Sequence, residues 1–130
     1  MSIQEAGRAG EAIARVLLKN DLHVDAIMQA DWLVQKSGIW YVVEVKYKER
    51  FKAPPFDGHG LDGYQADSRM RFFRDTGIRC LLLVIDANGA DVYWQWLDIL
   101  EGSEYHTTRN DVRIYDLRNF AHRDRKRLSA

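Results

Sequence analysis

Two acidic residues and a lysine have the types and spacing of a site that could hold a metal ion. Glu44 and Lys46 flank Val45 in an apolar run, and Asp31 stands at the start of an earlier strand-like run. Because side chains alternate between the two faces of a strand, Glu44 and Lys46 point the same way. Pairing of the two runs would bring Asp31 to them. Two carboxylates beside an ammonium group supply the hard oxygen ligands that Mg²⁺ prefers.

A β-hairpin is the element that must bring these residues together. Trp32 to Val34 and Ile39 to Tyr47 are predicted strands, and Ser37-Gly38 is the predicted turn between them. The alternative is that Glu44 and Lys46 form an ordinary ion pair on a solvated strand face, worth a few tenths of a kcal/mol. The apolar sequence around Glu44 disfavours this alternative, because a central strand seldom carries unpaired charge.

An amphipathic helix is predicted over residues 3–20. Ser2 and Glu5 have the spacing of a capping box, in which each side chain binds a backbone N–H of the first turn. The capping box accounts for Glu5, whereas Glu11 lies mid-helix without such a role. Small and apolar residues recur at spacings of three and four, and Asn20 is the expected end. These residues are Ile3, Ala6, Gly10, Ile13 and Leu17.

The middle of the chain is predicted to hold a strand, a loop and a second helix. Leu22 to Gln29 is an expected strand whose register the sequence does not fix. Phe51 to Gly60 contains both prolines and is expected to be an exposed loop. The sequence Asp62-Gly63-Tyr64-Gln65 resembles a second capping box, and the helix that follows is expected to end at Gly77.

A buried strand is predicted from Cys80 to Ile85, where all residues are apolar. A strand, a helix and a second strand form a βαβ unit, so this strand should lie parallel to the strand that carries Glu44. The remaining expected elements are a turn at Asn88-Gly89, a strand from Asp91 to Leu97, a strand from Val112 to Tyr115 and a frayed basic tail from Arg118 to Ala130.

Length and composition favour one soluble domain over residues 1–130. The chain has 46% hydrophobic and 12% aromatic residues, which is ample for a core, and its apolar runs are too short to cross a bilayer. A cytoplasmic protein without a membrane partner is expected, since the N-terminus lacks a secretory pattern. Cys80 is the only cysteine, so a disulfide within the chain is excluded. The histidines lack metal-ligand spacing, and no phosphate-binding glycine loop is present.

Basic residues form three clusters although the net charge of the chain is zero. Residues 46–52, 69–79 and 121–130 each carry four Lys or Arg against one acid. Such clusters could contact the phosphates of a nucleic acid. The alternative for each cluster is solvated charged surface, and the sequence leaves both interpretations open.

Glu11, Asp31 and Glu44-Val45-Lys46 together resemble the PD-(D/E)XK nuclease superfamily. The resemblance covers roughly residues 5–85, in the order helix Glu, strand Asp, strand Glu-x-Lys, helix and strand; Ala30 stands where the motif has proline. Residues 7–14 are also similar to the first helix of the Holliday-junction-resolvase-like branch. The resemblance implies a restriction-endonuclease-like α/β fold with an αβββαβ core, a mixed central sheet flanked by helices, and additional C-terminal strands.

The resemblance also implies a DNA endonuclease that depends on Mg²⁺, for which Mn²⁺ would substitute. Its metal ligands would be Asp31, Glu44 and the Val45 carbonyl, with Glu11 holding a second metal or an outer-shell water. Mg²⁺ supplies a hydroxide nucleophile and neutralises charge on the phosphate. Lys46 would orient or help to deprotonate the attacking water. A homodimer is a further possibility that the resemblance allows.

Gln65 is a further catalytic candidate that the resemblance suggests. Some relatives place a glutamine on the helix after the Glu-x-Lys strand, with tyrosine four residues later, where this chain has Arg69. The alternative for Gln65 is helix capping. The alternative for the whole protein is a catalytically inactive module that binds nucleic acid or protein. Whether the substrate is branched, nicked, single-stranded or duplex DNA stays open.

Overall fold

A five-stranded mixed sheet forms the centre of the protein in a computed structural model that describes residues 2–52, 55–87 and 91–124. The strand order is β1-β2-β4-β5-β8. Strands β2 and β4 are parallel, as predicted, and the other neighbours are antiparallel. The strands are β1 (Trp32–Lys36), β2 (Ile39–Lys48), β4 (Cys80–Asp86), β5 (Asp91–Trp96) and β8 (Ala121–Asp124).

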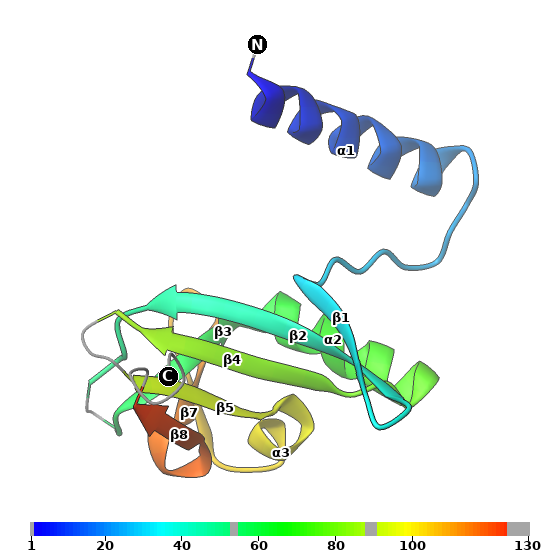
Figure 1. Ribbon diagram of the computed structural model, residues 1–130. Coiled ribbons are helices and arrows are strands. Elements are labelled where there is room, and N and C mark those ends of the chain that lie inside the picture. The colour runs from blue at the N-terminus through cyan, green and yellow to red at the C-terminus, as the bar shows by residue number, and fades with distance from the viewer. Residues whose placement is uncertain (1, 53–54, 88–90, 125–130) are drawn as a thin grey trace.

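A second sheet and the helix α2 complete the body of the protein. The second sheet contains β3 (Gly58–Asp62), β7 (Val112–Asp116) and β6 (Tyr105–Thr107), in the order β3-β7-β6. Helix α2 (Gly63–Thr76) crosses behind β2 and β4 in Figure 1, and α3 (Leu97–Glu101) and the short 3-10 helix η1 (Leu117–Asn119) follow β5 and β7. Leu61 of β3 and Tyr115 of β7 belong to the same buried cluster as Leu82 of β4, so one core joins both sheets.

The hairpin of β1 and β2 forms as predicted. Ser37 and Gly38 both have positive φ angles, 52° and 80°, which is the backbone of the tight turns that fit the twist of a hairpin. The register places Trp32 opposite Val43 and Lys36 opposite Ile39. Asp31 therefore lies just beyond the last pair of the ladder, next to Glu44 and Val45.

Helix α2 begins and ends where predicted, but its first turn lacks the predicted capping contact. Gly77 has a φ angle of 76° and donates its N–H to the Phe73 carbonyl at 2.8 Å, which is the expected glycine stop. The predicted capping box at Asp62 is wrong, because the Asp62 side chain makes no cap hydrogen bond. Asp62 is also the last residue of β3, and the Gly63 N–H is satisfied by the Asp111 carbonyl at 2.7 Å. The Gln65 side chain is thus available for other contacts.

Three predictions of secondary structure are wrong. Residues 22–29 form no strand in the described structure; instead Met28 packs on the core. The predicted loop 51–60 contains the start of β3, and Phe51 pairs with Gly58 through two hydrogen bonds of 2.9 Å. The expected tail contains most of η1 and all of β8, which pairs with β5. The predicted turn at Asn88-Gly89 and residues 125–130 lie outside the described residues.

Gly58 should be much harder to replace than Gly77. A Cβ added at Gly58 would collide with the Tyr115 carbonyl oxygen and lie 2.9 Å from Ile114 Cγ2, whereas one at Gly77 meets nothing within 4 Å. We expect Gly58→Ala to lower the free energy of unfolding by about 2 kcal/mol or more through overpacking. Gly77→Ala should cost about 1 kcal/mol, the penalty for a left-handed residue. Urea denaturation of both variants tests this order, and equal effects would contradict the β3–β7 geometry.

Helix α1 (Ile3–Asn20) stands apart from the sheet in Figure 1. The Ser2 hydroxyl accepts a hydrogen bond from the Glu5 N–H at 3.0 Å, so this half of the predicted capping box is present. None of its residues is buried, and Ile3 and Ile13 are 93% and 62% exposed. Arg15 Nη2 donates a hydrogen bond of 2.8 Å to Gln29 Oε1 and so links the helix to the segment before β1. Among the described residues, no helix is both long and apolar enough to span a membrane.

Candidate active site

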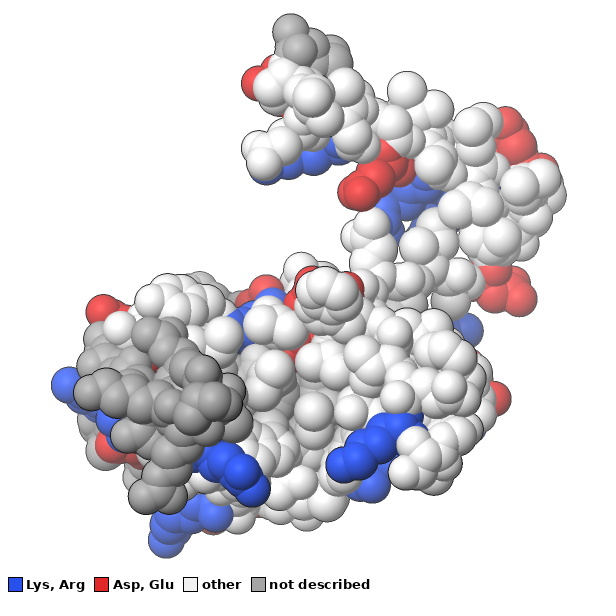
Figure 2. Space-filling model, in the orientation of Figure 1, with Lys and Arg blue, Asp and Glu red and all other residues white. Residues whose placement is uncertain are grey.

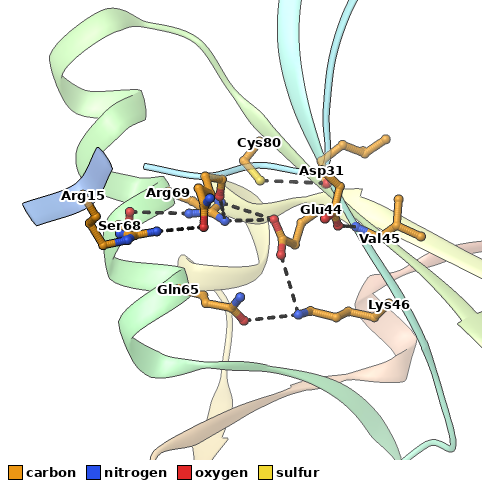
Figure 3. Close-up of polar contacts among 11 residues, drawn as sticks. Arg15, Asp31, Glu44, Val45, Lys46, Gln65, Ser68, Arg69 and Cys80 are labelled. Carbon is orange, nitrogen blue, oxygen red and sulfur yellow. Dashed lines mark hydrogen bonds and ion pairs between the residues drawn. The ribbon is translucent and has the colours of Figure 1, made fainter. Parts of the chain in front are cut away.

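Glu44 and Lys46 lie on the same face of β2 and point toward α2, as Figure 3 shows. Glu44 is buried, with 4% of its surface exposed, and Lys46 Nζ lies 3.6 Å from its Oε1 atom. Lys46 also donates a hydrogen bond of 3.2 Å to Gln65 Oε1 on α2. Strand β2 and helix α2 thus hold the lysine between a carboxylate and an amide oxygen.

Asp31 joins this group through the backbone of β2. Its Oδ2 atom accepts a hydrogen bond of 2.8 Å from the Val45 N–H. The ladder between β1 and β2 ends at Trp32 opposite Val43. Beyond it, the Asp31 carboxylate, in place of a backbone carbonyl, accepts the hydrogen bond from this edge of β2. A strand residue presents its N–H and its C=O to the same edge. The Val45 carbonyl is therefore directed toward the edge of β2 where Asp31 lies.

Arg69 is a site residue that the sequence interpretation did not include. Its Nη2 and Nε atoms lie 3.0 and 3.3 Å from Glu44 Oε2. Nη2 also donates to the Gln29 carbonyl, and Nη1 donates to Ser68 Oγ at 3.4 Å. One feature of the sequence could have indicated this role. Arg69 lies four residues after Gln65 and therefore on the same face of the helix. Arg69 connects β2, α2 and the segment that leads into Asp31.

Cys80 lies beside this group on β4 but has the properties of a core residue (Figure 3). Burial raises the pKa of its thiol to about 12, and the nearby Arg69 charge lowers it only in part. The thiol is therefore protonated at neutral pH and is a poor metal ligand or nucleophile. This agrees with the buried strand predicted from Cys80 to Ile85, in which a free cysteine is a small core residue.

Glu11 is not brought to Asp31 and Glu44. It lies exposed on α1, in a shallow hollow along that helix, and no group of three His, Cys, Asp or Glu side chains in the described ranges could hold a metal ion. Glu11 is one turn before Arg15, whose guanidinium binds the Gln29 side chain. Glu11 therefore shares the helix face that is linked to the segment before Asp31.

Ion pairs engage several arginines of the predicted basic clusters. Arg79 binds Asp98 at 2.8 Å and stacks over the Trp96 ring, and Arg71 lies 3.7 Å from Asp75. Arg50 lies 3.4 Å from Asp86. Outside the grey residues, most of the surface turned to the viewer in Figure 2 belongs to residues other than Lys, Arg, Asp and Glu. The clusters are thus partly used to hold the fold, which the sequence alone left open.

A groove of about 950 Å³ runs beside the candidate site, between α2, β1 and the segment before β1. Ser68, the hydrogen-bond partner of Arg69, is one of its lining residues. Its cationic lining residues are Lys19, Arg71 and Arg74, and its aromatic ones are Trp32, Tyr64 and Phe72. Three carboxylates, Asp25, Asp67 and Asp75, also line the groove, so it offers charged and aromatic side chains to a ligand but no net positive charge.

Comparison with known proteins supports the fold of the chain alone. No protein-family model and no curated protein sequence matches the chain. Among solved structures, the chain is similar to Hjc, a Holliday junction resolvase from the archaeal hyperthermophile Archaeoglobus fulgidus. The two share 13% sequence identity with a TM-score of 0.50, over 86% of this chain and 87% of Hjc. The protein therefore has the restriction-endonuclease-like α/β fold that its sequence predicted.

Proposed function

We propose that the protein is a metal-dependent DNA endonuclease, with residues 1–130 acting as one nuclease-like domain. One observation carries this proposal. Asp31 bonds to the Val45 backbone at 2.8 Å, and Lys46 lies 3.6 Å from the Glu44 carboxylate, so the acids and the lysine gather at one end of the hairpin. The similarity to a Holliday junction resolvase supports a nuclease through the shared fold.

The oxygen atoms of this group suit a hard divalent cation. Asp31, Glu44 and the Val45 carbonyl would hold Mg²⁺, which keeps several waters in its octahedral shell and so needs few protein ligands. Mn²⁺ accepts the same oxygen ligands and is expected to substitute. When bound, the ion would activate water and stabilise charge on the phosphate. Glu11 would add a carboxylate if α1 approached the sheet.

Lys46 and Gln65 have distinct roles in this proposal. Lys46 Nζ would orient the attacking water and offset charge that builds on the phosphate. Gln65 Oε1 accepts a hydrogen bond from Lys46 at 3.2 Å, which fixes the direction of the ammonium group. Gln65 is therefore a positioning residue in the free protein. The groove beside α2 would receive the DNA backbone.

A homodimer is also part of the proposal, because α1 exposes an apolar stripe. Ile13, Val16 and Leu17 are 62%, 57% and 47% exposed. A helix of this length gains most of its stability from packing of its apolar face. A second copy of the chain would supply such packing. Sedimentation of the purified protein over a range of concentrations would measure the association.

The test of the proposed activity is cleavage of a panel of DNA substrates. Purified protein would be incubated with branched, nicked, single-stranded and duplex DNA, in Mg²⁺, in Mn²⁺ and in EDTA. We expect internal cleavage with either metal and none in EDTA. The Asp31→Asn variant, prepared in parallel, controls for contaminating nucleases. Equal cleavage by this variant and the wild type would sink the assignment.

The alternative is a binding module that keeps the fold without catalysis. The observation that favours it is the ion pair between Arg69 and Glu44, which already neutralises the central carboxylate. Such a module would bind DNA or protein in the groove beside α2. It would show binding without cleavage in every metal.

Glu11 should matter more to activity than Glu5. Glu5→Gln keeps the backbone contact of the first helical turn, where the Glu5 N–H binds Ser2 Oγ at 3.0 Å. Glu11→Gln removes a charge that would help to hold the metal, so we expect cleavage to fall by roughly tenfold or more, with Glu5→Gln near wild type. Initial cleavage rates at limiting Mg²⁺ measure both. Equal effects would mean that α1 supplies no acid to the site.

A further inference from the structure

Arg69 binds Glu44 in surroundings from which water is largely excluded. The residues are 5% and 4% exposed, and two guanidinium nitrogens lie within 3.3 Å of one carboxylate oxygen. The attraction within a buried pair is screened far less than that of a surface pair. A metal ion that binds Glu44 must therefore compete with the Arg69 guanidinium for the carboxylate.

Arg69 also has partners that would remain if Glu44 turned away. Its guanidinium donates to the Gln29 carbonyl and to Ser68 Oγ. Arginine has five N–H donors in a fixed fork, so these contacts do not require the carboxylate. Release of Glu44 would thus leave Arg69 hydrogen-bonded. The guanidinium can stay in place while the carboxylate changes partner.

The formal charges of the site support competition between Arg69 and a divalent cation for Glu44. Asp31 and Glu44 supply two negative charges, and Lys46 and Arg69 supply two positive ones, so the group is neutral as it stands. Addition of a divalent cation would leave an excess of positive charge at short range. The phosphates of a DNA substrate would remove that excess.

We propose that Arg69 competes with the divalent cation for Glu44 and keeps metal affinity low until DNA is bound. This inference rests on the proposed metal-dependent function. By thermodynamic linkage, a DNA phosphate that offsets the Arg69 charge tightens metal binding, and metal tightens DNA binding by the same factor. Arg69 is therefore a positioning residue that couples the two ligands.

The test is Mn²⁺ binding to the full chain without DNA, measured by calorimetry for the wild type, Arg69→Gln and Arg69→Lys. We expect Arg69→Gln to bind Mn²⁺ roughly tenfold more tightly, the low end of what a neighbouring charge does to proton affinity at a carboxylate. Arg69→Lys keeps the charge and should stay near wild type. Arg79→Gln breaks a more exposed arginine–carboxylate pair, with Asp98, outside the site and should leave Mn²⁺ affinity unchanged.

A second measurement uses the wild-type protein and does not depend on the folding of a variant. The NMR signal of the Arg69 Nε–H is identified by its loss in Arg69→Lys. This signal should shift as Mg²⁺ is added, and the midpoint of the shift should equal the midpoint of Mg²⁺ binding. A signal unchanged at saturating Mg²⁺ would overturn the proposal.

The outcomes separate this inference from the proposed function. Metal binding that is equal in wild type and Arg69→Gln, or weaker in the variant, overturns competition but leaves a metal site in place. Binding in Arg69→Gln alone supports competition strongly. No binding in either protein refutes both the competition and the metal-dependent activity.

Discussion

Asp31→Asn is expected to abolish DNA cleavage while leaving the fold nearly unchanged. Asparagine can still accept the hydrogen bond from the Val45 N–H, now 2.8 Å from Asp31 Oδ2, so the edge of β2 keeps its partner. The metal, however, loses a charged ligand. Metal assistance supplies several kcal/mol, and each 1.4 kcal/mol or so is a factor of ten, so we expect a loss of about a thousandfold or more.

Glu44→Gln should lose activity to a similar degree but should also destabilise the protein. Glutamine can accept one hydrogen bond from Arg69, but it leaves a buried guanidinium without its counter-ion. Breaking such a pair from one side costs about 3 to 5 kcal/mol. Circular dichroism, urea denaturation and single-turnover cleavage on the same samples separate the two effects. A folded variant of either residue with full activity would remove it from the site.

Lys46→Met is expected to slow cleavage by roughly a hundredfold or more with little change in DNA affinity. The methionine side chain keeps much of the packing but removes the ammonium group that contacts Glu44 and Gln65. A group that acts mainly in the transition state changes turnover and not ground-state binding. Single-turnover rates and equilibrium DNA binding, measured in the same buffer, test this difference.

Lys48→Met is the matched control for Lys46→Met. Lys48 lies two residues further along the same face of β2, with its ammonium group 5.8 Å from the centre of the Phe51 ring. Burial, followed by the charge of Lys46, lowers its pKa, yet it has no place in the proposed chemistry. We expect turnover within a few-fold of wild type. A parallel loss of rate and DNA affinity in Lys46→Met would show that Lys46 only anchors a phosphate.

The hairpin and its acids could be predicted because their signals are local. Alternation in β2 places Glu44 and Lys46 on one face, and the Ser37-Gly38 turn fixes the register that brings Asp31 to Val45. The βαβ order then places β4 parallel to β2. These inferences need only neighbouring residues and the handedness of connections.

Arg69 could not be predicted as a buried partner of Glu44. An arginine on a helix is usually solvated, and burial depends on partners that only tertiary structure supplies. Here those partners are Glu44 and the Gln29 carbonyl, from two other segments. The same limit explains why Leu22 to Gln29 was wrongly expected to be a strand. In this segment the Gln29 carbonyl binds Arg69 and Met28 packs against the core, whereas Leu22 and Val24 are exposed and no strand pairs with the segment in the described structure.

Strands β3 and β8 were missed for different physical reasons. Strand β3 begins with Gly58, a residue depleted in strands, because the close approach of the Tyr115 backbone leaves no room for a Cβ. Strand β8 is an edge strand with exposed His122 and Arg123, so it lacks the apolar alternation of a buried strand. Both strands depend on partners far away in the sequence.

The sequence separations of the site contacts have a consequence for the order in which the site assembles. Asp31 meets Val45 across 14 residues within one hairpin, whereas Lys46 meets Gln65 across 19 and Glu44 meets Arg69 across 25, with α2 in place. Contacts of low sequence separation form with the smallest loss of chain entropy. During folding the two carboxylates therefore approach each other first, and the guanidinium that pairs with Glu44 arrives only when α2 docks.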